Sequence, residues 1–587
     1  MKKTSKKTVK VEVSDYSMQT EFSRTKLPTG EYSGIQPKDL TGIPETKTVM
    51  YDLERDAADL AAEFAERDPD LDPQYIWRGK RKNDLNALEV KAPIIYQQEK
   101  IFPRMLIEEM KRRSAIRRNA ADPQMMLGEG VEDFDPNAQP GFYNHEEGWK
   151  NRMILGDSLQ VMASLAENES LRGKVQMIYF DPPYGIKFNS NWQPSTKTTN
   201  VKDGKKEDIT REPEMVKAFR DTWHDGIHSY LGYLRDRFVV ARDLLAESGS
   251  IFVQIGDANV HKVRAVMDEV FGEENFVSQI AYRTTTGRAN DYLASASNFL
   301  LWYARSKVTC KVRQLYQDKS SGQTTDQFYN KVLRANGEVV PISKCKEGIS
   351  DGDRLFFPDN ITSSRPATGS DVREFQFSGH TFRIKSGTFK THFQGLMRLG
   401  KSNRLYATSN ESVRYVRYYN DFPCIPFSNM WTDTGTGSFT DDKIYVVQTG
   451  TKTIQRCMLM TTDPGDLVLD PTCGSGTMAY VAEQWGRRWI TIDTSRVALA
   501  LARTRLMTAK YPYYLLADSE EGMKKEMEVT GKAIIRDTYR KISQGFVYER
   551  VPHITLKAIA NNAEIDIIWE KYAAESERLR KVMGGVK

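Results

Sequence analysis

The sequence contains few of the residues that build disulfide or metal frameworks. Its 587 residues include five cysteines, an odd number with no C-x-x-C pair, and seven scattered histidines. These counts argue against a disulfide framework and against a structural zinc site. His224 and His228 stand four residues apart on an expected helix, but no third ligand lies near them in the sequence, so no metal site is predicted.

Long apolar runs are also missing. No stretch approaches the roughly 18 apolar residues of a membrane span, so no membrane partner is expected. The segment MKKTSKKTVK at the start of the chain is basic but lacks the apolar core of a secretory signal, which favours a cytoplasmic protein. A G-x-x-x-x-G-K-[ST] loop is absent as well, which argues against an ATP-hydrolysing motor in this chain.

The composition is that of a globular protein with several cores. Apolar residues make up 39% and charged residues 28% of the chain, and a length of 587 residues suggests roughly three or four domains. The net charge of +6 is unevenly distributed. Residues 301–430 hold about 20 Lys and Arg against about 11 Asp and Glu, so this segment carries the whole positive excess.

An alternation of strand and helix patterns begins near residue 150. Apolar strands at Met177–Phe180 and 250–257 alternate with amphipathic helices at 219–249 and 258–272. The same rhythm returns at 465–495. This alternation predicts an α/β fold with a parallel sheet, interrupted by an insertion of about 150 residues.

One strand end carries an unusual turn. The stretch MIYFDPPYGIKF, residues 177–188, places an acid, two prolines and a tyrosine directly after a buried strand. Consecutive prolines cannot continue a paired strand, because neither has an N–H for the ladder. We therefore expect Asp181, Pro182, Pro183 and Tyr184 to form a rigid turn, although such a turn alone is also compatible with a plain strand end and a surface acid.

A second motif, VLDPTCGSGT, again joins a strand to a turn. Val468–Asp470 is the expected strand, and the glycines that follow allow a sharp turn and the close approach of a ligand. After the next helix, the strand Trp489–Ile492 ends in Asp493, an acid well placed to accept hydrogen bonds from a ribose diol. The third glycine of a dinucleotide fingerprint is missing, so the motif predicts a nucleoside-containing cofactor, with a purely structural turn as the alternative.

Together the two motifs resemble a known family. DPPY at 181–184 with DPTCGSGT at 470–477 resembles the S-adenosylmethionine-dependent amino-methyltransferases of DNA, and the order of the motifs is that of their β group. The segments HSYLGYLRDRFVVARDLLAESGSIFVQIGD and VMDEVFGEENFVSQI are similar to the modification subunit of type III restriction systems. The resemblance covers roughly residues 150–510. It implies a Rossmann-like methyltransferase sheet in circularly permuted order, S-adenosyl-L-methionine as cofactor and methyl transfer to N6 of a flipped adenine in double-stranded DNA.

The resemblance also assigns roles to single residues. Asp181 and the carbonyl of Pro182 would accept hydrogen bonds from the target amine, beside Pro183, and Tyr184 would stack on the base. The residues implied in cofactor binding are Asp157, Lys452, Asp470, Pro471, Gly474, Ser475, Gly476, Thr477 and Asp493.

Two of these residues carry open alternatives, and two further positions differ from the family or have another possible role. Asp157 could instead be a plain helix N-cap. Lys452 lies where the family often has T-Q-K-P, but the proline is replaced by Thr453, and the family's usual phenylalanine before the glycines is Thr472. Trp431 in NMWTD also matches a family position, with a core tryptophan as the alternative.

The basic segment is a candidate DNA surface. Residues 381–420 contain about eight Lys and Arg, one acid and seven aromatic rings, and they lie where the family has its target-recognition region. A solvated basic loop is the alternative. The candidate phosphate and base contacts are Arg383, Lys385, Lys390, Arg398, Lys401, Arg404, Arg414 and Arg417.

The expected domains follow from these segments. We expect an N-terminal extension at 1–145 with helices at 51–67 and after Pro103, the catalytic half of the methyltransferase core at 146–280, an inserted target-recognition region at 281–430, the cofactor-binding half at 431–515 and a C-terminal appendage at 516–587. The resemblance implies a homodimer, a separate helicase–nuclease restriction subunit and a prokaryotic cytoplasm. Two alternative functions remain open: a cytosine-N4 methyltransferase, and a DNA-binding specificity subunit without activity.

Overall fold

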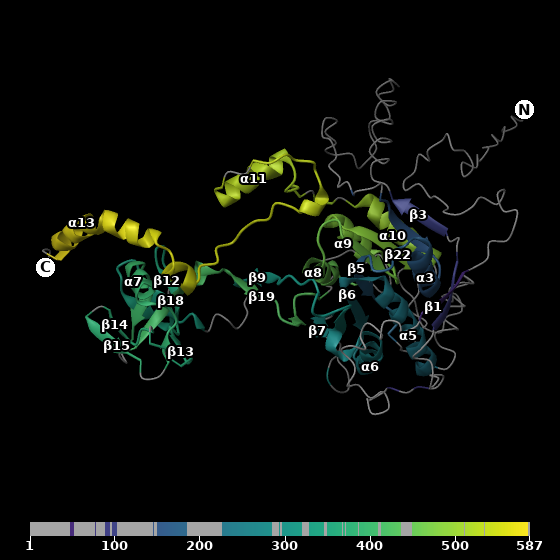
Figure 1. The fold of residues 1–587 in the computed structure, drawn as a ribbon, viewed down its shortest axis with the longest axis horizontal. Coiled ribbons are helices and arrows are strands. Elements are labelled where there is room, and N and C mark those ends of the chain that lie inside the picture. Colours follow the sequence, from purple (N-terminus) through teal and green to yellow (C-terminus); the bar gives the residue numbers. More distant parts are fainter. Residues whose placement is uncertain are drawn as a thin grey trace, which may run out of the picture. The chain divides into compact units, whose positions relative to one another are not determined.

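The computed structural model describes two compact units (Figure 1). The first comprises Met1–Leu315 and Ser428–Val547, and the second Tyr316–Phe427 and Tyr548–Lys587. Residues are described at 47–51, 88–93, 97–101, 149–184, 226–284, 296–319 and 328–584, the last range with gaps of which the longest is 436–448, and singly at Tyr75, Trp77, His145 and Leu293.

A sheet of nine strands forms the centre of the first unit. The parallel strands at its centre have apolar, fully buried sequences such as VQMIYF, as expected for a sheet covered on both faces. In spatial order the strands are β20 (Met430–Trp431), β7 (Phe276–Arg283), β8 (Ser297–Ala304), β6 (Leu245–Ile255), β5 (Val175–Phe180), β21 (Leu467–Asp470), β22 (Arg488–Asp493), β4 (Asn151–Leu155) and β3 (Gln97–Ile101).

The strand pairing confirms the predicted permuted α/β sheet. The five strands from β6 to β4 run parallel, while β8 and β3 flank them antiparallel. Strands β5 and β21 are neighbours although almost 300 residues separate them, with Met177 opposite Val468 and Ile178 opposite Leu469. Because parallel strands end at the same edge of a sheet, the turns after β5, β21 and β22 meet at one edge.

Helices cover both faces of this sheet. The helices α3 (Ser158–Asn168), α5 (Ile227–Leu244) and α6 (Val260–Phe271) pack on one face, and α8 (Thr451–Thr461), α9 (Thr477–Gln484) and α10 (Arg496–Thr508) lie along the other (Figure 1). Alternation along β5 sends Phe180 into the first layer, where it meets Phe238 of α5 edge to face, while Tyr179 points to the α8 side.

The expected N-terminal helices at 51–67 and after Pro103 lie outside the described residues. What is described there is a pair of antiparallel strands, β1 (Lys47–Tyr51) and β2 (Leu88–Ala92), whose Val49 and Val90 belong to the main core. At the other end of the first unit, α11 (Glu520–Thr530) is followed by Phe546, which bridges back to Leu516. No helix in the described part of the chain has the length and apolar character needed to cross a membrane.

The second unit is built on an antiparallel sheet of five strands. Their order is β11 (Val339–Pro341), β10 (Lys331–Leu333), β12 (Arg354–Asp359), β18 (Val413–Tyr418) and β17 (Leu405–Ala407). Shorter pairs are β9 (Tyr316–Asp318) with β19 (Cys424–Pro426), β13 (Thr362–Ser363) with β16 (Thr388–Phe389) and β14 (Glu374–Phe377) with β15 (His380–Arg383). Its helices are α7 (Phe393–Lys401), α12 (Leu556–Ala560) and α13 (Glu564–Gly584).

This unit begins later in the chain than the expected insertion. The insertion was expected from residue 281, but β7 and β8 belong to the main sheet, so the second unit starts at Tyr316. It also includes the C-terminal residues from Tyr548, because Ile559 of α12 packs with Leu396 and Leu399 of α7.

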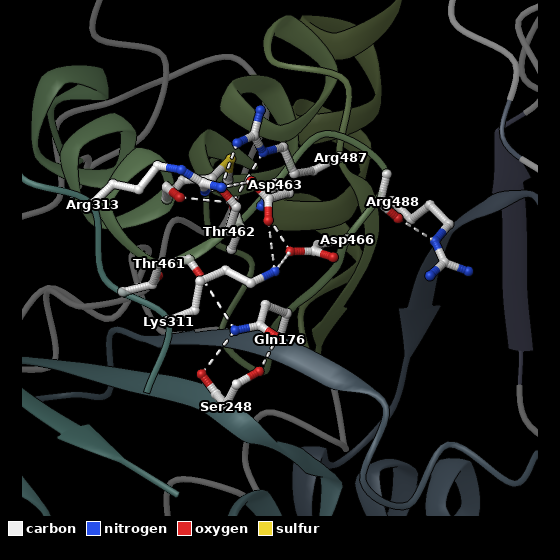
Figure 2. A network of polar contacts seen from close by, with 12 residues as sticks. Gln176, Ser248, Lys311, Arg313, Thr461, Thr462, Asp463, Asp466, Arg487 and Arg488 are labelled. Carbon is white, nitrogen blue, oxygen red and sulfur yellow. Dashed lines mark hydrogen bonds and ion pairs between the residues drawn. The ribbon is translucent and has the colours of Figure 1, made fainter. Parts of the chain in front are cut away.

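A polar network fixes the edge of the sheet opposite to the three turns (Figure 2). Lys311 follows β8, and its Nζ lies 2.9 Å from Oδ2 of Asp463 and 2.7 Å from Oδ2 of Asp466, just before β21. The backbone N–H of Lys311 also donates to the carbonyl of Ser248 at 3.1 Å. The chain is therefore tied to the core directly before it leaves for the second unit.

Buried donors extend this network across the strand starts. Gln176 of β5 donates from Nε2 to the carbonyls of Ser248 and Thr461, at 2.9 and 3.1 Å, and the guanidinium of Arg487 donates to the carbonyl and hydroxyl of Thr462, at 2.8 and 3.0 Å (Figure 2). These bonds satisfy carbonyls at the end of α8 that have no partner within the helix.

Replacing Lys311 by methionine should destabilise the first unit. The change keeps the aliphatic stem but leaves Asp463 and Asp466 without their shared ammonium group, and we expect a loss of about 1 kcal/mol in the free energy of unfolding. Urea unfolding monitored by circular dichroism measures it. Lys307→Met is the matched control, because the Lys307 side chain is exposed; equal midpoints for both variants would contradict the role given to Lys311.

Candidate active site

The turn after β5 holds its acid with two hydrogen bonds to other segments. The backbone N–H of Asp181 donates to Oγ1 of Thr472 at 2.9 Å, and its Oδ2 accepts from Oγ1 of Thr449 at 3.0 Å. Pro182 is buried and has no N–H to donate, so the strand ladder ends here as the sequence predicts. The direction of the Asp181 carboxylate is thus set by residues that are distant in sequence.

The turn after β21 leads into α9 through glycines in a left-handed conformation. Gly474 has φ of +51° and Gly476 has φ of +70°. A Cβ on Gly476 would lie 2.7 Å from Cβ of Ala502, so both backbone conformation and packing against α10 require glycine there. The hydroxyls of Ser475 and Thr477 bond to each other at 2.9 Å.

Thr472 connects the two turns. Its backbone N–H donates to Oδ1 of Asp470 at 2.9 Å, while its Oγ1 accepts the N–H of Asp181. The family's usual phenylalanine could not form the second bond. The Thr472 hydroxyl therefore links the end of β21 directly to the end of β5, which a phenylalanine ring could not do.

The acid at the end of β22 also binds a neighbouring turn. Oδ2 of Asp493 accepts the N–H of Gly474, and Oδ1 accepts the N–H of Ser495, both at 2.8 Å. Asp493 therefore links the end of β22 to the glycine turn after β21.

Both turns line one hollow that is open to solvent. Of the residues predicted to form the site, Asp181, Asp470, Gly474, Ser475 and Thr477 line it. Thr449 and Thr472, which the sequence did not single out for this role, line it too. None of its described lining residues is Lys or Arg.

The electrostatics of the hollow are those of buried acids. Burial raises the pKa of Asp181 to about 7, although hydrogen bonds from Thr449 and Tyr184 act in the opposite direction. Burial, together with the nearby carboxylates of Asp181 and Asp493, raises the pKa of Asp470 to about 8. A positively charged ligand would favour the ionised form of each acid, so the hollow is suited to a cation.

Tyr184 is held by its hydroxyl. The hydroxyl oxygen accepts from Nε2 of Gln254 at 2.5 Å and from Nδ2 of Asn298 at 3.3 Å. Its backbone carbonyl accepts from Nδ2 of Asn259 at 2.8 Å. A Cβ on Gly256 would stand 3.2 Å from Cδ2 of the ring, so glycine at the end of β6 leaves room for the ring.

Five of the predicted cofactor residues do not line the hollow: Asp157, Lys452, Pro471, Gly476 and Asp493. Asp157 caps α3 by accepting the N–H of Leu159 at 2.8 Å, as its alternative role predicted, and its Oδ2 also pairs with the buried Arg237 at 2.7 Å. Lys452 is 59% exposed, and its Nζ lies 3.9 Å from Oδ2 of Asp433. Asp433 is paired mainly with Arg456, whose guanidinium lies over the buried ring of Trp431.

The residues predicted to contact DNA lie in different environments. Arg398 and Lys401 of α7 pair with Asp566 of α13 at 2.8 and 2.7 Å, and Arg404 pairs with the buried Asp421, so all three stabilise the second unit. Arg383 and Lys390 are exposed, with bonds to Glu374 and to the carbonyl of Asn360. Arg414 and Arg417 of β18 are half-buried, and Lys385 lies outside the described residues.

Replacing Asp470 by asparagine should stabilise the protein at alkaline pH. A carboxyl whose folded pKa is raised costs stability as pH rises from its unfolded value near 3.8 through about 8, and asparagine removes this cost while keeping the oxygen that accepts from Thr472. We expect the variant to gain at least about 1 kcal/mol over the parent by pH 8.5 and nothing at pH 4. Melting temperatures across this range test it; a constant difference would contradict the raised pKa.

Comparisons with known proteins agree with this geometry. A family model described as DNA methylase matches residues 175–504, more than half of the chain. The type II methyltransferase M.EcaI of Enterobacter cloacae is 24% identical over 347 residues, 58% of this chain and 66% of that protein. The type III restriction-modification enzyme StyLTI Mod subunit of Salmonella typhimurium is 23% identical over 374 residues, 60% of this chain and 53% of that protein.

Among solved structures, the M1.HpyAVI–SAM complex aligns with 60% of this chain and 98% of its own, at 11% identity and a TM-score of 0.28. The chain spans between about half and two thirds of the length of the two relatives above. The family match includes both strand-end turns and the sheet between them. The chain belongs to the DNA methylase family.

Proposed function

We propose that the protein is a sequence-specific DNA adenine-N6 methyltransferase that uses S-adenosyl-L-methionine and acts in a prokaryotic cytoplasm. The observation that carries the proposal is the single hollow shared by Asp181 and the Gly474–Gly476 turn. The acid that would bind the target amine and the glycine turn that would bind the cofactor nucleoside thus face the same space. Methyl transfer between two bound molecules requires such an arrangement.

The hollow fits S-adenosyl-L-methionine on chemical grounds. This cofactor would supply an activated methyl group on a positively charged sulfur. Asp181, Asp470 and Asp493 lie close together without a Lys or Arg among the described lining residues, and such a site favours a cation. Asp493 stands at the end of β22 beside the N–H of Gly474, which is where an acid would meet the ribose of a bound nucleoside.

The residues at the end of β5 would prepare the target amine. Adenine N6 is a weak nucleophile because its lone pair is delocalised into the ring. The ionised Asp181 and the carbonyl of Pro182 would accept its two hydrogens and so localise the lone pair. The prolines keep that carbonyl fixed before the substrate arrives, so no reorganisation is needed during the reaction.

Access to such a turn requires a flipped base. Extruding a base from a duplex costs a few kcal/mol of free energy. Stacking of the base on an aromatic ring such as Tyr184 offsets roughly 1–3 kcal/mol of this cost. Tyr184 is partly exposed and its ring is fixed through the hydroxyl, so it can present one face to the base without a further loss of side-chain freedom.

The alternative substrate is cytosine, whose N4 is also an exocyclic amine. The aspartate at position 181 favours adenine only as a family tendency. Digestion of methylated DNA to nucleosides, followed by mass spectrometry, identifies the product; N4-methylcytosine alone would overturn the choice of adenine.

We further propose that the protein is the modification arm of a type III-like system. The support is similarity to relatives named as Mod subunits, over about half of their length. In this proposal the chain forms a homodimer and joins a separate restriction subunit, and the second unit contacts DNA. Arg383, Lys390, Arg414 and Arg417 are the described candidates. Arg398, Lys401 and Arg404 hold largely buried internal ion pairs, whereas the pair of Arg383 with Glu374 is exposed and can open to solvent.

Replacing Asp181 by alanine should abolish methyl transfer without abolishing binding. Removal of the carboxylate takes away one preorganised acceptor, and we expect the rate to fall by at least about 10²–10³-fold, with cofactor affinity nearly unchanged. Transfer of a tritiated methyl group to unmethylated bacterial DNA measures the rate, and calorimetry measures cofactor binding. Glu247→Gln, an exposed acid on the opposite edge, is the control. Equal transfer by the Asp181 variant would refute the assignment.

The affinity for DNA should fall steeply as the salt concentration rises, because Arg side chains of the second unit would contact phosphates. Replacing Arg414 and Arg417 together by glutamine should flatten the slope of log affinity against log salt by up to about 2, because each phosphate contact contributes about 0.9. Fluorescence anisotropy with a random duplex measures the slope. The control removes Lys174 and Lys307, two exposed lysines of the first unit. A slope unchanged by the arginine pair would place the contacts elsewhere.

A further inference from the structure

A buried amide lies behind the candidate active site. Gln254 of β6 is 3% exposed, and its side chain lies between Tyr179, Tyr184 and Thr449. Its Nε2 donates to the hydroxyl of Tyr184 at 2.5 Å and to Oγ1 of Thr449 at 2.9 Å. Both donors of the amide are therefore engaged, one toward each group.

The orientation of this amide is fixed from the other side. The hydroxyl of Tyr179, a fully buried residue of β5, donates to Oε1 of Gln254 at 2.6 Å. With the phenol proton of Tyr179 on the amide oxygen, the amide nitrogen faces Tyr184 and Thr449, so this bond favours the orientation in which both N–H groups point to the site. Neighbouring strands β5 and β6 bring the two residues together.

The amide reaches the acid through one hydroxyl. Thr449 accepts from Nε2 of Gln254 at 2.9 Å. Two acceptors lie within reach of its single proton, Oδ2 of Asp181 at 3.0 Å and Oε1 of Gln254 at 3.1 Å, and an ionised carboxylate is the stronger acceptor. The position of the Asp181 carboxylate and that of the Tyr184 ring thus both depend on Gln254. These two groups must keep one relative geometry if the first is to hold an amine and the second the face of the same base.

We propose that Gln254 and Thr449 are positioning residues for methyl transfer, which set the Asp181 carboxylate and the Tyr184 ring relative to each other through one hydrogen-bonded chain. This inference rests on the proposed function, since it gives the chain a role in that reaction. Neither residue belongs to the motifs by which the site is found in the sequence, and neither needs to touch the substrate.

The charge on the acid depends on the same chain. The hydrogen bond from Thr449 lowers the pKa of Asp181 against the effect of burial, which raises it. A hydroxyl at position 449 therefore both orients the carboxylate and extends its ionised form toward lower pH. Loss of the hydroxyl should be visible in the pH dependence of the rate, which a purely structural contact would not alter.

The test compares Thr449→Val with Thr449→Ser. Valine keeps the shape and removes the hydroxyl, whereas serine keeps the hydroxyl. In single-turnover methyl transfer at neutral pH we expect valine to lower the rate by about 10–100-fold and serine to restore it to within about 3-fold of the parent. Cofactor affinity should change by less than about 2-fold, and the midpoint of the pH–rate profile should move upward for valine only.

A second variant keeps the test independent of position 449. Tyr179→Phe removes a hydroxyl that helps to orient the amide, and we expect a smaller loss of about 3–10-fold. This loss should not be additive with that of Thr449→Val, because Gln254 reaches Asp181 through Thr449. Melting temperatures show that each variant is folded.

The outcomes separate the two proposals. If the parent protein transfers no methyl group to any DNA, the proposed function fails. If the parent is active and Thr449→Val matches it in rate and pH midpoint, or serine fails to restore the rate, the positioning role is wrong while the proposed function stands.

Discussion

The structure depends on the parallel pairing of β5 with β21. Two short apolar strands from distant parts of the chain lie side by side in a fixed register, with Met177 opposite Val468. Their ends then fall at one edge of the sheet, where Thr472 can reach the backbone of Asp181. Without this pairing the acid and the glycine turn would belong to separate surfaces, and no common hollow would exist.

A second constraint is electrostatic. Three carboxylates gather at the same edge, and two of them are buried enough that their pKa values rise into the neutral range. Such a cluster costs stability in the free protein, because ionised acids are poorly solvated there and repel one another. In the proposed reaction the cofactor carries a positive charge, which would offset this cost and link cofactor binding to the ionisation of Asp181.

Much of the fold was predictable from periodicity and turn chemistry. The strand endings at Asp181 and Asp470 follow from proline and glycine, which act locally. The second unit was harder to delimit, because β7 and β8 pair antiparallel, whereas the expected pattern was that of a parallel sheet. The predicted insertion therefore began at 281, while the compact unit begins at Tyr316.

Side-chain partners were not predictable, because they join segments that no local pattern relates. Gln254 and Thr449 are ordinary polar residues in the sequence and become part of the site only through bonds to Tyr184 and Asp181. The density of positive charge also led to the prediction that Arg398 and Lys401 contact DNA. Their partner Asp566 lies about 165 residues further along the chain, so no local pattern indicated these ion pairs. The composition shows that a segment is basic, but it does not show which of its positive charges pair with acids in the folded protein.

The network around Lys311 has a consequence for how such proteins diversify. The outgoing chain is tied to the core at Lys311, and the returning chain is tied again where Met430–Trp431 joins the main sheet beside β7. With both junctions anchored, residues between them that do not pack on α12 or α13 can be substituted while the edge that holds Asp181 and the glycine turn keeps its shape. The second unit can therefore change its exposed surface independently of the first.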